Sequence, residues 1–332
     1  MTNSPKMLGL KILTAVCIMA SAPAIVAQGI DRGQRQAALI FQILASELAL
    51  NEGELGVAAA TYLTIARQTR DPDAARRATE LLIQARAPQE ALEAAEIWLS
   101  ANPSDLEAQT TVDLIELVLG QTDKLVKSLV VRREAARKDD KLDGFYDYLA
   151  GLAGRATSRD AGAQIFETVS APDAKRPAVL YTQAMLHERA GNAVAMERLL
   201  RELIQLDPMH AHAHNALGYH LADRNERLEE ALALIERALS LAPKDAHIID
   251  SMGWIQYRLG NLDSAEKYLR AAFLQQPDTE ISTHLGEVLW IKGKTEEAES
   301  LWRAAFANDP RNELLQNTLK RLGVSPMRVH PQ

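Results

Sequence analysis

The amino-acid sequence predicts an all-α solenoid, a stack of helix pairs in which each pair contacts its neighbours. Three observations support this prediction. Residues 245–310 contain the same pattern of small residues and proline twice in succession. The prolines that close this pattern recur at spacings of 33 to 35 residues. The chain is 47% hydrophobic but only 5% aromatic, so alanine and leucine form most of the core, as tight helix packing requires. An internal period of this length is typical of repeat architectures.

The repeated pattern has a mechanical interpretation. A glycine is followed after 12 residues by an alanine, after 7 more by a second alanine, and after 5 more by a proline. The glycine and the two alanines allow two helices to approach closely, while Gly260 and Gly293 lie in the turn between the helices and the proline ends the second one. The members of the two copies are Gly253, Ala265, Ala272 and Pro277, then Gly286, Ala298, Ala305 and Pro310.

This helix-turn-helix unit resembles the tetratricopeptide repeat, whose pattern has a period of 34. The matches include Met252-Gly253, Leu285-Gly286, Ala265-x3-Leu269 and Ala298-x3-Trp302. The resemblance implies a right-handed superhelical solenoid of about 16–17 helices. Four repeats are expected over residues 177–310, because four residues each stand 12 positions before a proline. These residues are Met196, Ala231, Ala265 and Ala298.

The rest of the chain divides around these four repeats. Residues 28–138 are expected to form degenerate helical repeats, and residues 311–332 a capping helix and tail. Residues 139–176 have the weakest pattern and predict a degenerate helix pair and a linker, with a hinge or an inserted contact surface as the alternative. Turn and proline signals separate the expected helices at 34–50, 55–68, 73–86 and 89–101, and two more lie within 106–138 around Gly120.

Residues 1–27 have the pattern of a secretory signal peptide. Lys6 and Lys11 precede an uncharged run that ends in small residues, and cleavage is expected after Ala27, with Ala24 as the alternative. Lipidation of Cys17, the only cysteine, is disfavoured because the bulky Val16 precedes it and Lys11 shortens the apolar run. The pattern therefore predicts export to the periplasm, with membrane association only if Cys17 were lipidated.

The sequence contains no pattern that predicts catalysis, a cofactor or a metal site. The formal charge of −7 would become −9 without Lys6 and Lys11, so nucleic acid is not an expected partner. Gly293-Lys294-Thr295 resembles the end of a phosphate-binding loop, but no strand precedes it and a turn glycine explains it. Among the histidines at 210, 212 and 214, only His210 and His214 could share a metal, and no carboxylate or cysteine completes the ligand set.

The resemblance to tetratricopeptide arrays also implies a binding surface. In such arrays the first helix of each pair lines a concave groove. The predicted groove residues are Tyr181, Met185, His212, Asn215, Tyr219, His247, Asp250, Trp254, Tyr257, Glu287 and Trp290. Trp254 is expected to point away from its helix pair, whereas for Tyr257 and Trp290 the alternative is that they close the core between helices. Such a ladder of aromatic residues suits an extended peptide or a partner helix.

Several strings are similar to one family of exported proteobacterial repeat proteins, which scaffold a PDZ-bearing carboxyl-terminal processing protease and deliver cell-wall hydrolases to it. The strings are NALGYHLADR at 215–224, DSMGWIQYR at 250–258 and HLGEVLW at 284–290, with ARQTRDP at 66–72 and PxxLEAQ at 103–109. The resemblance covers residues 36–323. It implies a non-catalytic periplasmic scaffold for such a protease and its substrates. A general envelope or secretion assembly adaptor that never binds a protease is the alternative.

Overall fold

The computed structural model describes residues 32–325, and this part of the chain is entirely helical. It contains seventeen α-helices, α2 to α18, one 3-10 helix, η1, and no strand. The predicted all-α solenoid with a C-terminal capping helix is therefore confirmed. The predicted signal peptide, its cleavage site and Cys17 lie outside the described residues. Within those residues, no helix combines the length and the apolar composition needed to cross a membrane.

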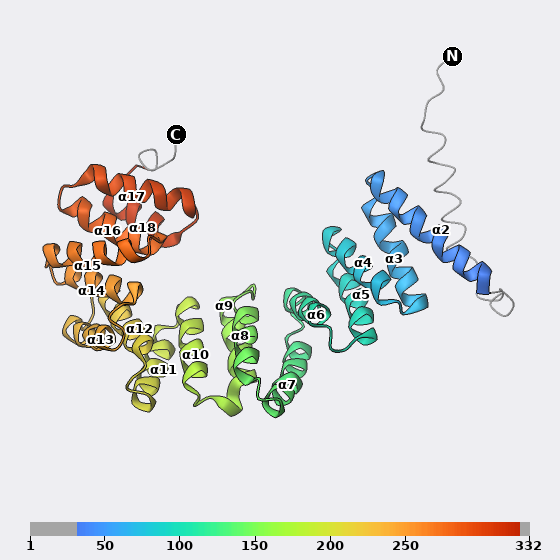
Figure 1. The fold of residues 1–332 in the computed structure, drawn as a ribbon, viewed down its shortest axis with the longest axis horizontal. Helices are drawn as coiled ribbons and strands as arrows, with labels where there is room; N and C mark the ends of the chain where they lie inside the picture. Colours follow the sequence, from blue (N-terminus) through green and yellow to red (C-terminus); the bar gives the residue numbers. More distant parts are fainter. Residues whose placement is uncertain (1–31, 326–332) are drawn as a thin grey trace, which may run out of the picture. The chain divides into compact units, whose positions relative to one another are not determined.

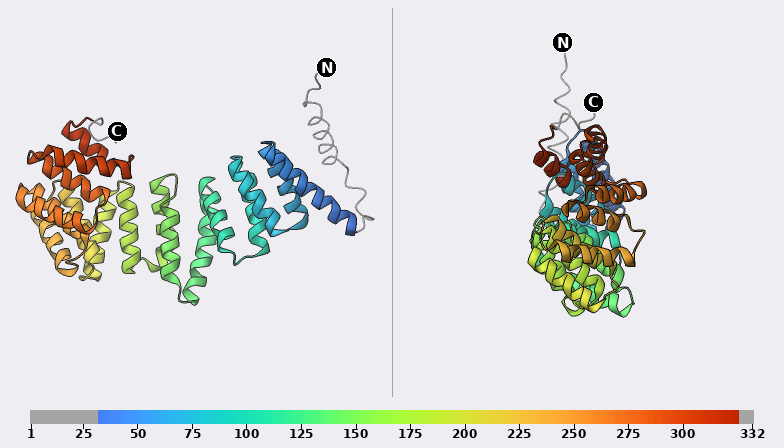
Figure 2. Two further views of the ribbon diagram at one scale, coloured as in Figure 1. Left: turned by 45° about the horizontal axis from the view of Figure 1, so that its top comes forward. Right: turned by 90° about the vertical axis from the view of Figure 1, so that its left-hand side faces the viewer.

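The chain forms two compact units, of which the first ends at Leu125 and the second begins at Val126. The division falls inside α7 (Thr122–Lys138). The earlier helices are α2 (Arg32–Asn51), α3 (Leu55–Thr69), α4 (Pro72–Gln84), α5 (Pro88–Ala101) and α6 (Leu106–Val118). Apart from α7, helices that follow one another in sequence pack side by side within each unit (Figure 1, Figure 2).

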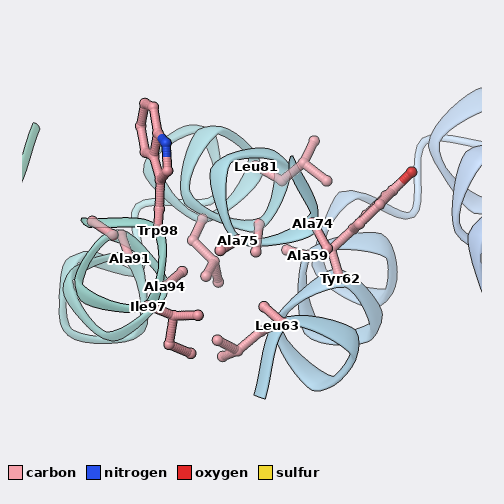
Figure 3. Packing of buried hydrophobic residues seen from close by; sticks show 14 of the residues in the cluster. Ala59, Tyr62, Leu63, Ala74, Ala75, Leu81, Ala91, Ala94, Ile97 and Trp98 are labelled. Atoms are coloured by element: carbon pink, nitrogen blue, oxygen red, sulfur yellow. The ribbon is translucent and has the colours of Figure 1, made fainter. Parts of the chain in front are cut away.

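The core of the first unit is made largely of alanine. Ala75 on α4 and Ala91 on α5 are fully buried, and larger side chains such as Leu63 and Trp98 fill the space around them (Figure 3). Small side chains at the contacts allow helix axes to approach closely. The turns match the sequence signals, since the Asp71 carboxylate caps α4 by accepting a hydrogen bond from the Ala74 amide at 2.8 Å.

The second unit continues with successive helix pairs and ends in a single helix. Its helices are α8 (Leu142–Ala153), α9 (Arg159–Ser170), η1 (Ala171–Asp173), α10 (Pro177–Arg189), α11 (Ala193–Leu206), α12 (Ala211–Asp223), α13 (Leu228–Leu241), α14 (Ala246–Arg258), α15 (Leu262–Gln275), α16 (Thr279–Ile291), α17 (Thr295–Asn308) and α18 (Glu313–Leu322). The pair α8 and α9, which has the weakest sequence pattern, has buried side chains of its own, including Leu149 and Phe166.

Glycines set the distance between the two helices of a pair, as the repeat pattern predicts. A Cβ atom added at Gly286 on α16 would lie 2.3 Å from the Trp302 indole nitrogen on α17. At Gly253 on α14 it would lie 2.6 Å from Cγ of Leu269 on α15. Both distances are too short for any other residue, so the close approach of these helices requires glycine. Gly260, in the turn between α14 and α15, has a φ of 84°, which also favours glycine.

The last helix, α18, covers the apolar end of the second unit. Leu315 and Leu319 are buried against a cluster that includes Trp302 of α17. Its polar side carries exposed Lys320 and Arg321. Solenoids need such a helix because their final repeat would otherwise leave an apolar face in water.

Candidate functional site

The first helices of four successive pairs, α10, α12, α14 and α16, form one continuous surface of the second unit. One helix pair, α14 and α15, lies between Tyr219 on α12 and His284 on α16, yet the Tyr219 hydroxyl lies 3.2 Å from Nε2 of His284. Because this contact joins the two helices on either side of α14, the row of first helices curves toward the side that carries these residues. We call this side the inner surface. Its accessible side chains are Tyr181, Met185, Glu188, His212, Asn215, Tyr219, Asp223, His247 and Glu280.

Three of the residues that were expected to be exposed on the groove are instead buried. Trp254 is 2% exposed, Asp250 3% and Glu287 0%. The expectation of exposure is wrong for these three, because successive helix positions are rotated by about 100°. Trp254 stands one place after Gly253, and the rotation directs its side chain toward α16, the first helix of the next pair. There the indole ring stacks on His284, with ring centroids 4.2 Å apart.

The remaining predicted residues reach solvent to different extents. His247 and His212 are exposed, whereas Tyr181, Asn215 and Tyr219 are half-buried on the inner surface. The Tyr181 ring lies 5.3 Å from the His210 ring and 6.4 Å from the His212 ring. These aromatic side chains give α10 and α12 a shared, accessible patch.

Tyr257 and Trp290 close the core, which is the alternative that the sequence left open. Both are half-buried and pack against the cluster that contains Leu289 and Trp302. The centroid of the Trp290 ring lies 5.7 Å from that of Trp302. Tyr257 and Trp290, the aromatic residues nearest the C-terminal end of the predicted groove, therefore contribute to packing between repeats.

A buried hydrogen-bonded network joins three of the inner helices. Nδ1 of His284 donates to Oδ2 of Asp250 at 2.8 Å, and Nε2 faces the Tyr219 hydroxyl. Burial alone would lower the pKa of His284, but the adjacent Asp250 carboxylate raises it to about 9. The imidazole is therefore protonated at neutral pH and donates from both nitrogens. Since Tyr219 accepts the bond from Nε2, its own hydroxyl proton is oriented away from His284.

Sequence reasoning missed His284, although a signal was present. His284 stands two places before Gly286, where the equivalent positions in the neighbouring repeats hold Ser251 and Ala216. A histidine among small residues at a packing position indicates a buried polar contact. The sequence could not identify its partners, because Asp250 and Tyr219 belong to two other helix pairs.

The capping helix α18 supplies the counterion for a second buried charge, the Glu287 carboxylate. Arg321 on α18 forms an ion pair with Glu287 on α16, with Nη2 and Oε2 2.6 Å apart. The pKa of the neighbouring Tyr257 rises to about 12, first because the phenol is buried and then because Glu287 lies beside it. The Glu287 carboxylate therefore stabilises the end of the array and is not available to a ligand.

Carboxylates give the accessible inner surface an acidic character. Glu188 on α10, Asp223 on α12 and Glu280 on α16 are exposed. Although Glu188 reaches solvent, the protein around it partly removes its carboxylate from water and so raises its pKa, and the charges of Glu280 and Asp223 raise it further. Burial likewise raises the pKa of Glu280. The charge effect on Glu188 arises because the inner surface brings its carboxylate close to those of Glu280 and Asp223.

The structure offers no arrangement typical of a metal centre within residues 32–325, since no three His, Cys, Asp or Glu side chains gather in that way. His210 instead caps α12, accepting a hydrogen bond from the Ala213 amide through Nδ1 at 3.1 Å. His214 is buried, with Nε2 3.2 Å from the Pro208 carbonyl.

Comparison with protein families identifies the repeats. Two tetratricopeptide-repeat models match residues 181–246 and 224–288. A curated relative, a TPR repeat-containing protein of Pseudomonas aeruginosa, is 40% identical over 172 residues, which is 50% of this chain and 29% of the relative. The match therefore spans less than a third of that relative's length.

Solved structures of tetratricopeptide-repeat proteins are also similar. One, from Thermus thermophilus, aligns with a TM-score of 0.46 and 22% identity over 53% of this chain and 98% of its own. Another, from Parabacteroides merdae, aligns with a TM-score of 0.45 and 13% identity over 86% of this chain and 98% of its own.

Proposed function

We propose that this chain, whose residues 181–288 are tetratricopeptide repeats, is a non-catalytic scaffold that binds a protein partner on its inner surface. Proteins built from these repeats generally act by binding other proteins. The observation that carries the proposal is the hydrogen bond between the Tyr219 hydroxyl, on the inner surface, and the fully buried His284. This bond fixes the orientation of the hydroxyl. Its proton is thus presented to an acceptor such as a backbone carbonyl of the partner.

The chemistry of the inner surface favours an extended segment that carries basic residues. Tyr181 offers an accessible aromatic face, and aromatic residues are frequent anchors of binding interfaces. Glu188 is repelled by the charges of Glu280 and Asp223, so a Lys or Arg of the partner placed among these carboxylates would relieve their mutual repulsion. Main-chain acceptors of the same segment would then face Tyr219.

We further propose that the scaffold works in the periplasm and that its partner is a carboxyl-terminal processing protease or a cell-wall hydrolase substrate of that protease. Support comes from the signal-peptide pattern of residues 1–27 and from the strings at 215–224, 250–258 and 284–290 that resemble the protease scaffolds. A lipid anchor at Cys17 remains disfavoured by the sequence around it. The competing proposal is a general envelope assembly adaptor.

Binding measurements on inner-surface variants test the proposal. Tyr219→Phe removes only the hydroxyl and should weaken capture of the protease by roughly two- to tenfold, the contribution of one hydrogen bond. Glu188→Gln combined with Glu280→Gln should weaken it by about tenfold at low salt and less at high salt. The matched control is Glu229→Gln with Glu236→Gln, two exposed carboxylates on α13.

The outcomes separate the proposals. Unchanged capture by well-folded inner-surface variants would place the partner on another surface. If the parent protein binds no such protease but binds basic peptides in a Tyr219-dependent way, the general adaptor becomes the better conclusion.

A further inference from the structure

The first helix of the chain carries a second apolar stripe that nothing covers among the described residues. Leu39, Ser46 and Leu50 of α2 face the core of the first unit. On the opposite side of the same helix, four large apolar side chains are between 49% and 64% exposed. These are Ile40, Phe41, Leu44 and Leu48, and together with Ala37 we call them the outer stripe. A contiguous exposed stripe of several large apolar side chains is typical of an interaction surface.

The spacing of the outer stripe predicts a helix as its occupant. Ala37, Phe41, Leu44 and Leu48 are separated by 4, 3 and 4 residues. This is the spacing of a coiled-coil seam, which presents apolar knobs to a second helix. A membrane surface fits less well, because interfacial helices carry many basic residues on their polar face and the opposite face of α2 is packed in the core.

The length of α2 also indicates that it packs against a second helix. It has 20 residues, whereas its neighbour α3 has 15. Residues 33–38 are all exposed, so the first turns of α2 extend without support from the unit. Short helices are marginal in water when they have no packing partner, and a helix along the outer stripe would stabilise these turns.

We propose that the outer stripe pairs with the outer stripe of a second copy of this chain, in antiparallel orientation about a twofold axis between Gln42 and Ile43. In this register large residues face smaller ones: Phe41 lies opposite the partner's Leu44, and Ala37 opposite the partner's Leu48. A twofold interface of this kind uses the same patch on both copies and closes on itself.

The charges at the two ends of α2 determine the orientation. Arg35 is exposed near the start of α2, and Glu52 and Glu54 are exposed just after its end. Antiparallel pairing places Arg35 within about one helical turn of the partner's Glu52, whereas parallel pairing places like charges side by side. The helix dipoles also oppose one another in the antiparallel arrangement.

Sedimentation velocity of the purified, processed protein tests this proposal. The parent is expected to be a dimer, and Phe41→Glu with Leu44→Glu should raise the dimer dissociation constant at least about tenfold while helicity is retained. The control is Val194→Glu with Leu274→Glu, which are each 83% exposed on α11 and α15 and should leave the dimer unchanged.

A charge exchange tests the orientation. Arg35→Glu should weaken the dimer, and addition of Glu52→Arg in the same chain should restore it. A parent that stays monomeric at about 100 μM, well above the dissociation constants of specific dimers, would overturn the proposal, as would a dimer that survives Phe41→Glu with Leu44→Glu. Loss of a different bound protein in that variant, with a monomeric parent, would identify a foreign helix as the occupant. Failure of the charge exchange to restore pairing would refute the antiparallel register.

Discussion

His284 is a fully buried side chain that carries a positive charge, and the residues around it explain how. Asp250 supplies a carboxylate at hydrogen-bond distance, and Tyr219 accepts from the other ring nitrogen. The Trp254 ring covers one face of the imidazole. A buried charge is tolerated only when such partners replace water. Because the three hydrogen-bonded residues come from α12, α14 and α16, the network fixes three repeats relative to one another.

The first prediction concerns the pH dependence of stability. The pKa of His284 is raised from 6.5 to about 9 on folding, so its protonated form stabilises the protein fully below pH 6.5. This contribution is lost as the pH rises through about 9. It amounts to about 3 kcal/mol of unfolding free energy, from about 1.4 kcal/mol for each pKa unit.

Denaturant unfolding of the parent and of His284→Gln between pH 6 and pH 10 measures this contribution. The difference between their unfolding free energies should be largest near pH 6 and should shrink toward pH 10. Parallel curves over this range would show that His284 is neutral in the folded protein. An NMR titration of the His284 ring then gives its pKa directly.

At the same scale, the sequence predicted the helices and turns better than the side chains of the site. Turn residues such as Gly260 and Asp71 act through local backbone preferences, so single positions suffice to locate them. The burial of Trp254 depends on which neighbouring helix covers that side of α14, and periodicity within one helix does not contain this information. The same reason explains the burial of Glu287, whose cation lies on α18, 34 residues further along the chain.

At the scale of the element, the close contact between two helices of a pair depends on glycine, which has no side chain to keep them apart. Gly286 allows α16 to lie against the Trp302 ring, and the Trp302 indole donates to the Thr283 carbonyl at 3.3 Å. Gly151, in the interior of α8, has no atom within 4 Å of a Cβ placed there. The two glycines therefore have opposite structural roles in the same unit.

The second prediction uses this pair. Gly286→Ala should destabilise the protein by roughly 1–3 kcal/mol, because the buried Trp302 ring must shift. Gly151→Ala should stabilise it by about 0.5–1 kcal/mol, because alanine loses less conformational entropy in a helix. Thermal unfolding should thus give melting temperatures that change in opposite directions. A neutral Gly286→Ala would mean that α16 and α17 can separate at little cost.

The third prediction concerns the attachment of α18. Arg321→Met leaves the Glu287 carboxylate buried without its cation and should cost about 3 kcal/mol. Adding Glu287→Gln removes the charge and should recover much of that loss, whereas Lys320→Met, on the exposed side of α18, should have little effect. Denaturant unfolding with limited proteolysis near 311–325 measures both stability and release of α18. Equal loss in the single and double variants would indicate that packing of the Arg321 side chain, rather than its charge, holds the helix.

At the scale of the whole molecule, helix pairs within each unit are stabilised by the neighbouring pairs of that unit, as in other repeat proteins. Helices with two well-packed neighbours should therefore open rarely. In α14 and α16 the packing glycines, the His284 network and the Glu287 ion pair all act on the same two helices. In α8, Gly144 and Gly151 are exposed within a helix of 12 residues, which lowers its intrinsic helical stability.

The fourth prediction is a gradient of hydrogen exchange along the chain. Amides of α14 and α16 should exchange most slowly, and those of α8 should be faster because its glycines favour local opening. Residues 33–38 of α2 should exchange fastest in dilute protein, since no packing covers them. If two copies pair through the outer stripe, their exchange should slow as the protein concentration rises, and Phe41→Glu with Leu44→Glu should abolish that dependence. Equal protection of α8 and α14 would contradict the assignment of a weaker central pair, and fast exchange of 33–38 at every concentration would argue against pairing through α2.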